Sequence, residues 1–365
     1  MLSLTEEIRI PAKKIPGILG DVEKAAKAVK LVYVQDSQSG ISRKKIKNEF
    51  RYFFNGKRVV ETETLERIKK LVIPPAWTNV WICPLDNGHL QVTGLDAKKR
   101  KQYKYHTLWN RLRNHTKFYR LYEFGKVIPV IRQQLELDLA LPGLPLEKVL
   151  AAVVSLMEQT SIRIGNNIYE KLYGSFGLTT LKNKHVLISG NQLRFTFRGK
   201  KGIFHKIQIS DKRLAKIVKQ CREIPGKELF QYFDEQGNHK SIDSGLVNSY
   251  IKSIAGDDFT AKDFRTWAGT LEAIKAFESL AFDKDMNIKQ NINLMLDAVS
   301  AHLGNTRSVC RKYYIHPAVI ALYEKNQLDT YFKSREKTMD ARKPFQLTAE
   351  EQLLMKILEK ETLIC

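Results

Sequence analysis

Five side chains of types that can act on a phosphate ester are spread along the sequence. They are Arg163, Lys200, Arg265, Asn305 and Tyr314. Two guanidinium groups can hold the nonbridging oxygens of a phosphodiester and stabilise the charge of its transition state. A lysine can protonate a leaving alkoxide, and a phenol can attack phosphorus and keep the phosphoryl group as an ester.

Each of these residues has a commoner role when it occurs alone. Arg163 follows a predicted helix and lies between isoleucines, where an internal ion pair is the usual explanation. Lys200 lies at the tip of a predicted hairpin, where lysines usually face solvent. Arg265 is one residue beyond Phe264, at the edge of an apolar helix face, and Asn305 follows a helix-ending glycine, an ordinary place for a turn residue. Only the combination with a tyrosine favours chemistry.

The tyrosine is one of a pair. Residues 303–317 read LGNTRSVCRKYYIHP, so Tyr313 and Tyr314 are adjacent. Neighbouring residues of a helix point about 100° apart, so only one of the two phenols can face a given phosphate. Val309 would share a face with Tyr313, and Cys310 with Tyr314. Periodicity therefore does not choose between them.

The composition points to a polyanionic partner. The 365 residues include 61 Lys and Arg against 39 Asp and Glu, a net charge of +22. A folded protein with this charge usually binds a polyanion, and nucleic acid is the first candidate, ahead of a membrane surface or a ribosome. Hydrophobic residues make up 43% of the chain, enough for packed cores, and the length suggests two or three domains.

Other signals are missing from the sequence. The four cysteines form no CxxC pair, so neither a zinc site nor a disulfide framework is expected. Paired carboxylates at metal-ligand spacing and a P-loop are also missing, so we expect no metal and no nucleotide cofactor. Because the N-terminus lacks an apolar signal segment and no window reaches transmembrane length, we expect a cytoplasmic protein.

A basic segment at residues 95–120 reads LDAKKRKQYKYHTLWNRLRNHTKFYR. It contains nine Lys or Arg and one acidic residue, with Tyr103, Tyr105 and Trp109 among the cations. A solvated linker could have this charge. The interleaved aromatic rings favour a nucleic-acid surface, because rings pack on sugars and bases while the cations bind phosphates.

Periodicity and turn residues predict a β-rich start and a mainly helical remainder. The run FRYFFNGKRV has an Asn-Gly turn between aromatic-rich segments, a strong hairpin signal, and further strands are expected to about residue 95. Residues 185–209 predict a three-stranded meander. Helices are expected from about Pro145 to Thr160, at 260–277, from about 286 to 303 before Gly304, and at about 347–362. The predicted fold class is α+β.

Seven motifs in order carry a resemblance to a known family. They are IPPAWTNVWICP, TGLDAKKRKQYKYH, SIRIG, GLTTLKNKHVLIS, FRGKKG, KDFRTW and LGNTRSVCRKYYIHP. Between about residues 50 and 325 the sequence resembles the small type IB DNA topoisomerases of poxviruses and bacteria, the bacterial branch in particular. The resemblance implies a β-rich N-terminal domain (1–110) and a mainly helical catalytic domain (111–365) with a small antiparallel sheet. It also implies that the two close as a C-shaped clamp round duplex DNA.

The resemblance also implies roles for individual residues. Tyr314 would be the nucleophile, and Arg163, Lys200, Arg265 and Asn305 would assist it. DNA contacts would come from Arg100, Gln102, Tyr103 and Tyr105, and we add the neighbouring cations Lys98, Lys99 and Lys101, and Lys262 of the KDFR motif.

Three positions depart from the pattern of relatives. Poxvirus members have His at the position of Asn305, whereas bacterial members resemble this chain. An amide at this position can donate a hydrogen bond but cannot act as a base near neutral pH. Arg307 stands where relatives commonly have Pro, and Tyr313 where they commonly have Cys.

The predicted function is relaxation of supercoiled DNA by transient single-strand cleavage through a 3′-phosphotyrosyl intermediate, followed by religation, without ATP or metal. The protein would act as a monomer on duplex DNA, preferably supercoiled, in the cytoplasm at the nucleoid, with no membrane or small-molecule partner. One alternative is a tyrosine recombinase, since Lys262-Asp-Phe-Arg265 resembles the (His/Lys)xxArg box of that class. Another is a non-catalytic architectural DNA-binding protein, which the composition alone would favour.

Overall fold

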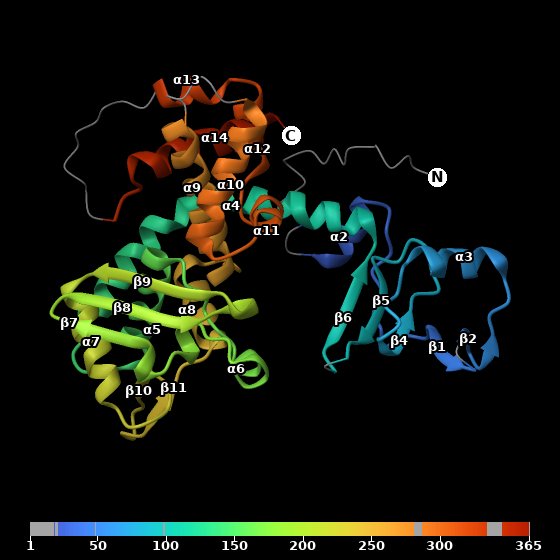
Figure 1. The fold of residues 1–365 in the computed structure, drawn as a ribbon, viewed down its shortest axis with the longest axis horizontal. Coiled ribbons are helices and arrows are strands. Elements are labelled where there is room, and N and C mark those ends of the chain that lie inside the picture. The colour runs from blue at the N-terminus through green and yellow to red at the C-terminus, as the bar shows by residue number, and fades with distance from the viewer. Residues whose placement is uncertain are drawn as a thin grey trace. The chain divides into compact units, whose positions relative to one another are not determined.

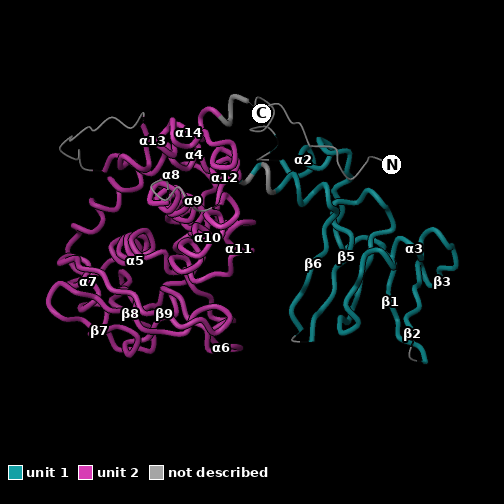
Figure 2. Tube along the Cα trace, turned by 45° about the horizontal axis from the view of Figure 1, so that its top comes forward, with its two compact units in different colours: residues 1–119, 362–365 teal, residues 120–361 magenta. Residues whose placement is uncertain are grey.

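The computed structural model describes residues 18, 21–47, 49–97, 99–280, 287–333 and 345–364 (Figure 1). The chain divides into two compact units (Figure 2). The first contains residues 1–119 and 362–365, and the second contains residues 120–361. Within the described ranges, no helix is long and apolar enough to cross a membrane.

The first unit is built on an antiparallel sheet of six strands in the order β3-β2-β1-β4-β5-β6. The strands are β1 (Ile41–Ile46), β2 (Glu49–Phe54), β3 (Lys57–Arg58), β4 (Thr78–Ile82), β5 (Leu90–Leu95) and β6 (Lys101–Tyr105), and the helices are α2 (Val22–Ala28) and α3 (Thr62–Lys70). The predicted Asn-Gly hairpin joins β2 to β3, with Asn55 and Gly56 both at positive φ, as a tight hairpin turn requires.

The sheet is larger than the sequence predicted. Residues 41–46, which include most of the basic run SRKKIK (42–47), form strand β1, and the basic segment after residue 95 contributes strand β6. Arg43 of strand β1 contacts strand β2 and the segment before β4. The Arg43 guanidinium lies 4.2 Å from the centre of the Phe50 ring and donates to the carbonyls of Pro74 and Trp77 at 3.0 and 2.7 Å. These contacts stabilise a charged strand that periodicity alone would not identify.

The second unit is mainly helical, which confirms the predicted α+β class with a smaller β-rich N-terminal region. Its helices are α4 (Thr107–Leu139, which begins in the first unit), α5 (Leu146–Thr160), α6 (Asn167–Tyr173), α7 (Lys212–Glu223), α8 (Ser244–Ala255), α9 (Ala261–Leu280), α10 (Ile288–Leu303), α11 (Arg307–Tyr313), α12 (Pro317–Glu324), α13 (Leu328–Lys333) and α14 (Ala349–Ile364). The predicted meander is present as β7 (Val186–Ser189), β8 (Gln192–Arg198) and β9 (Phe204–Ser210).

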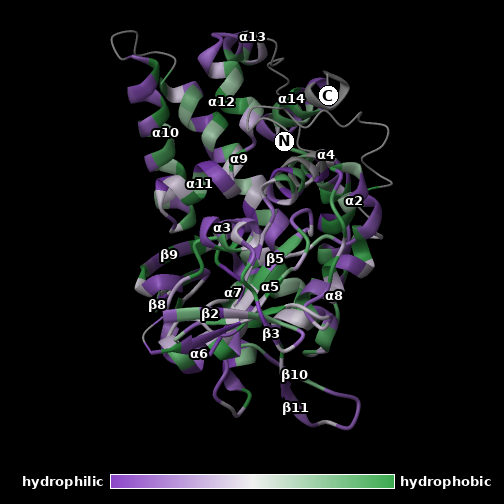
Figure 3. Ribbon diagram, turned by 90° about the vertical axis from the view of Figure 1, so that its right-hand side faces the viewer, coloured by the Kyte–Doolittle hydropathy of each residue, from purple (hydrophilic) through white to green (hydrophobic). Residues whose placement is uncertain are grey.

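A second, two-stranded sheet was not predicted. It consists of β10 (Gln231–Phe233) and β11 (His239–Ser241). All three residues of β11 are exposed, and the hairpin is largely hydrophilic in Figure 3. Strands of three residues are too short to show an alternation that a sequence reading could detect.

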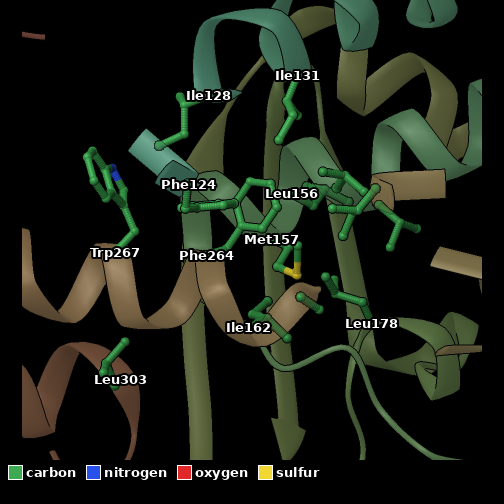
Figure 4. Close-up of a cluster of buried hydrophobic side chains, with 14 of the residues drawn as sticks. Phe124, Ile128, Ile131, Leu156, Met157, Ile162, Leu178, Phe264, Trp267 and Leu303 are labelled. Atoms are coloured by element: carbon green, nitrogen blue, oxygen red, sulfur yellow. The ribbon is translucent and has the colours of Figure 1, made fainter. Parts of the chain in front are cut away.

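Helices α4, α5 and α9 contribute many of the core residues of the second unit. Phe124 of α4 packs edge-on against Phe264 and Trp267 of α9, with ring centres 5.0 and 6.1 Å apart (Figure 4). Helix α5 is buried at every position from Val149 to Met157. Helices that are packed on several sides have little freedom to shift, so residues at their ends are held in fixed positions.

Candidate active site

The five candidate residues come from separate elements of the second unit. Arg163 follows the end of α5, and Arg265 lies in the second turn of α9. Asn305 is in the turn between α10 and α11, and Tyr314 is the residue at which α11 ends. Lys200 begins the turn that joins β8 to β9. The fold brings several of them into contact, although they are far apart in the sequence.

Arg163 binds the turn that carries Asn305. Its Nη2 donates to the Asn305 Oδ1 atom and to the carbonyl of Gly304, the latter at 3.1 Å. Gly304 ends α10 at φ +58°, a left-handed conformation that glycine adopts without strain, and so places Asn305 beside the arginine. The predicted helix stop is therefore confirmed, and it also positions the amide.

Arg265 is more deeply buried than the sequence predicted. We expected it at the edge of an apolar face, but it is 5% exposed. Its Nη1 donates to the carbonyl of Ser161, and its Nη2 donates to the carbonyl of Leu303 at 2.8 Å. The guanidinium thus binds the carbonyls at the ends of α5 and α10, where a helix leaves its last carbonyls without partners inside the helix.

Tyr314 lies beside Arg265. The Cζ atom of Arg265 is 5.2 Å from the centre of the Tyr314 ring. Helix α9 also fixes the tyrosine backbone. The Thr270 hydroxyl donates to the Thr266 carbonyl of its own helix at 2.8 Å and accepts from the His316 N–H at 3.1 Å. The same hydroxyl lies 3.3 Å from the Tyr314 carbonyl. A Cβ atom on Gly269 would lie 2.6 Å from that same carbonyl oxygen, so only a glycine permits this approach.

The adjacent Tyr313 has a different environment. It is 37% exposed, and the Nζ atom of Lys312 lies 5.3 Å from the centre of its ring. Helix periodicity left the two tyrosines equivalent, whereas the packing of α9 against Tyr314 distinguishes them. Arg307, another departure from relatives, begins α11 and forms an ion pair with Asp297 of α10.

The charge of the two arginines is not compensated by acidic groups. In the part of the chain that the structure describes, neither Arg163 nor Arg265 has a carboxylate partner, so the internal ion pair that such residues usually make is missing. Burial and the charge of Arg265 lower the pKa of Arg163 to about 10. Burial likewise lowers the pKa of Arg265. An anion bound beside the two arginines would raise both pKa values and offset the cost of burying their charges.

Two further donors at the site have no partner. Arg265 Nε and Asn305 Nδ2 are buried without a hydrogen bond among the described residues. A buried donor left unpaired costs about 1–3 kcal/mol, so it is normally satisfied by protein, water or ligand. The same described ranges contain no cluster of three His, Cys, Asp or Glu residues arranged to hold a metal ion. The site therefore offers donors and positive charge to an anion.

Lys200 occupies the predicted hairpin tip and is exposed. The turn that contains Lys200 packs against His205, which in turn packs against Gly304 beside Asn305. The sequence analysis did not single out His205. Carbon atoms built on Gly199 and on Gly304 would each lie within 2.6 Å of the His205 ring. Strand register could have pointed to His205, because it lies directly opposite the buried Phe197 and therefore on the same face of the sheet.

The candidate DNA contacts of the first unit divide into two groups. Strand β6 is an edge strand with Lys101, Tyr103 and Tyr105 exposed along one face, and the two tyrosine rings stack nearly parallel at 6.0 Å. Arg100 and Gln102 instead both bind Asp96, at 2.7 and 3.0 Å.

The remaining cations are less constrained. Lys99 is exposed in the β5–β6 turn, and Lys262 is exposed in the first turn of α9. Lys98 lies outside the described residues. Lys101 forms an ion pair with Asp36 at 2.6 Å, which must open or be shared if a phosphate binds there.

Comparison with known proteins identifies the family. Residues 98–341 match the model of the eukaryotic DNA topoisomerase I catalytic core, and residues 49–96 match the model of the bacterial DNA topoisomerase IB N-terminal domain. The chain is 33% identical over 296 residues to DNA topoisomerase 1B of Acanthamoeba polyphaga mimivirus, covering 79% of this chain and 88% of that protein.

More distant relatives agree with this result. Over 269 residues the chain is 26% identical to DNA topoisomerase 1 of rabbit fibroma virus (strain Kasza), covering 70% of this chain and 81% of the relative. Over 250 residues it is 26% identical to DNA topoisomerase 1B of vaccinia virus (strain Copenhagen), covering 66% and 75%. The chain therefore belongs to the type IB DNA topoisomerases, a family of isomerases.

Proposed function

We propose that this protein relaxes supercoiled DNA by transient cleavage of one strand, with Tyr314 as the nucleophile. The observation that carries the proposal is a group of buried cations and donors that includes Arg265, which lies beside the Tyr314 ring, and Arg163, which binds Asn305. Among the described residues, Arg163 and Arg265 have no carboxylate partner, and the buried Nε of Arg265 and Nδ2 of Asn305 have no hydrogen-bond partner. A phosphodiester supplies the missing negative charge and the missing acceptors.

In the cleavage step, the Tyr314 oxygen attacks phosphorus and its proton passes to solvent. The bond from phosphorus to the 5′-oxygen breaks, and the leaving oxygen takes a proton from Lys200, so the products are a 3′-phosphotyrosyl ester and a 5′-hydroxyl. Arg163 and Arg265 stabilise the charge that grows on the nonbridging oxygens. Lys200 suits the acid role because it lies on an exposed turn that can move towards the leaving group.

Asn305 would act as a hydrogen-bond donor in this scheme. Its Oδ1 already accepts from Arg163, which leaves the Nδ2 group to donate to a phosphate oxygen. An amide cannot accept a proton near neutral pH, so this residue does not serve as a base. The interaction with Arg163 also fixes which end of the amide faces the substrate.

Religation reverses the cleavage step. The 5′-hydroxyl attacks the phosphotyrosyl phosphorus, its proton returns to Lys200, and Tyr314 leaves as a phenolate that takes a proton from solvent. Between the two steps the free strand end rotates and torsional strain drives relaxation. One phosphate ester replaces another, so the reaction needs no ATP, and the charge stabilisation comes from arginines rather than from a metal.

Binding to duplex DNA would use both units. In the first, the exposed face of β6 offers a lysine and two stacked tyrosines to the backbone, and in the second, Lys262 is exposed one turn before Arg265. The net charge of +22 supports a strong electrostatic contribution, and a chromosomal substrate would place the protein at the nucleoid.

A plasmid-relaxation assay tests this function. Negatively supercoiled plasmid is incubated with the full chain in excess EDTA and without nucleotide, and topoisomers are separated on a gel. We expect stepwise relaxation by the wild-type protein and none by Tyr314→Phe. Loss of relaxation in EDTA, restored by one particular metal, would contradict the proposed mechanism. Joined or exchanged plasmids would instead indicate a recombinase.

A further inference from the structure

His205 lies between two parts of the site but has no role in the mechanism above. It is the second residue of β9, directly opposite Phe197 of β8. The two rings stack, with centres 5.0 Å apart and planes 17° from parallel. Since Phe197 is 3% exposed and belongs to the core of the second unit, it holds the imidazole in a fixed orientation.

Two glycines make room for this imidazole. A Cβ atom on Gly199 would lie 2.6 Å from both Cδ2 and Nε2 of His205. A Cβ atom on Gly304 would lie 2.4 Å from Cε1. Real Cβ atoms do not approach other atoms so closely, so any larger residue at either position would displace the ring.

The two glycines adjoin different catalytic elements. Gly199 immediately precedes Lys200, the proposed acid. Gly304 immediately precedes Asn305, and its carbonyl accepts a hydrogen bond from Arg163. The imidazole therefore fills the space between the lysine turn and the segment that binds the arginine.

We propose that His205 is a positioning residue that holds the Lys200 turn against the Gly304–Asn305 segment, so that the lysine reaches the leaving 5′-oxygen. The inference rests on the proposed function, because it assigns His205 a part in placing the acid of that mechanism. The ring would act through Lys200 and would not itself touch the reacting atoms.

The electrostatic environment suits an uncharged imidazole in this place. Burial, and then the charges of Arg163 and Arg265, lower the pKa of His205 below its ordinary value. In the described part of the chain neither ring nitrogen has a hydrogen-bond partner, so packing rather than a polar contact fixes the ring. A neutral ring can fill this space without adding a third positive charge beside the arginines.

The test compares two DNA substrates under single-turnover conditions. Both are duplexes with one cleavage site mapped with the wild-type protein, and one of them has sulfur in place of the bridging 5′-oxygen. A thiolate leaves without a proton, so the sulfur substrate does not need the acid. The ratio of the two cleavage rates is measured on a single protein preparation, so a misfolded fraction cancels from it.

His205→Ala should lose cleavage of the oxygen substrate by about 10- to 100-fold and cleavage of the sulfur substrate by no more than about threefold, as Lys200→Ala should. His205→Asn, a smaller planar group, should fall between wild type and His205→Ala. His239→Ala removes an exposed histidine from β11 and should match wild type on both substrates.

Equal losses by His205→Ala on both substrates, or no loss on either, would overturn the inference while leaving the proposed function in place. If Lys200→Ala is not rescued by sulfur, the acid assignment fails and the inference falls with it. If the wild-type protein forms no covalent adduct with either substrate, the proposed function itself is wrong. Should His205→Ala fail to fold, His205→Asn provides the same ratio.

Discussion

The guanidinium carbon of Arg265 lies 5.2 Å from the centre of the Tyr314 ring. Both residues are fixed by α9, since the helix carries the arginine, its Gly269 lies against the Tyr314 carbonyl, and its Thr270 hydroxyl accepts from the His316 N–H, two residues after the tyrosine. The cation and the phenol are therefore placed by one rigid element. This arrangement is what a reaction needs when a phosphate must be held and attacked at the same point.

The arginines should matter for cleavage more than for binding. We expect Arg163→Ala and Arg265→Ala each to slow single-turnover cleavage by about 10²–10³-fold, because each removes a donor aimed at the charge of the transition state. Duplex affinity should change little, since one phosphate contact among several is lost. Cleavage rates and filter-binding affinities, measured on the same duplex, check this.

Arg222→Ala, which removes an exposed arginine from α7, serves as the control and should cleave normally. Arg265→Lys should stay far below wild type, because an ammonium cannot bind the carbonyls of Ser161 and Leu303 in the way that a guanidinium does. If binding and cleavage fall in parallel, the arginines only position the DNA.

Affinity for DNA should fall steeply with salt. For about six phosphate contacts, the plot of log affinity against log salt should have a slope on the order of −5. Lys101→Ala should make the slope less negative by about one unit, because one phosphate contact is lost. Lys24→Ala removes a lysine that is likewise paired with an aspartate, Asp21, and should leave the slope unchanged. A wild-type slope near zero would contradict electrostatic binding to the DNA backbone.

Helix α14 lies beyond the region that matches the catalytic-core model, yet it supports α9. Glu351 of α14 is 4% exposed, accepts two hydrogen bonds from Arg132 at 2.7 and 2.9 Å, and accepts a third from Trp267 Nε1 at 3.1 Å. Trp267 is two residues beyond Arg265 on α9. The carboxylate therefore ties the C-terminal helix to the helix that carries the arginine.

Glu351→Gln should destabilise the protein by about 2 kcal/mol, because it removes the bidentate partner of Arg132 and leaves that half-buried guanidinium paired, among the described residues, only with Glu158, at 2.7 Å. Denaturant unfolding at neutral pH measures this. Glu324→Gln makes the same change at an exposed position in α12 and should have little effect. Equal stability of the two variants would show that Glu351 does not support α9.

The effect of Glu351 should also depend on pH. Burial acts to raise its pKa, but the hydrogen bonds and charge of Arg132, and the bonds from Thr348 and Trp267, hold it below the ordinary 4.5. A carboxyl group whose pKa is lower in the folded state contributes its full stabilisation when the pH is above its ordinary pKa. That contribution is lost as the pH falls through the pKa of the folded state. The difference between wild type and Glu351→Gln should therefore narrow below pH 4.5.

The sequence correctly predicted the elements whose backbone conformation is set by residues close to them in the chain. The Asn-Gly hairpin, the three-stranded meander and the helix stop at Gly304 each follow from one or two residues with special backbone preferences. The candidate residues were found through motif order, and the structure brings Arg163 to Asn305 and Arg265 to Tyr314. Their chemical roles remain proposals.

Features set by distant partners were not predictable. Strand β1 is stabilised by contacts between Arg43 and carbonyls more than thirty residues away. Arg265 is buried because the ends of α5 and α10 supply its acceptors, and no local pattern reveals that. The position of His205 depends on two glycines in separate loops, so it emerges only when the chain is folded.

The most direct test of the central assignment is to identify the residue that becomes linked to DNA. The adduct formed with a duplex is trapped by denaturation, digested with protease, and the linked peptide is sequenced. We expect the phosphoryl group on Tyr314, with Tyr314→Phe binding duplex but forming no adduct and Tyr313→Phe forming it at a rate near that of wild type. A phosphoryl group on Tyr313, or an adduct that survives Tyr314→Phe, would contradict the account.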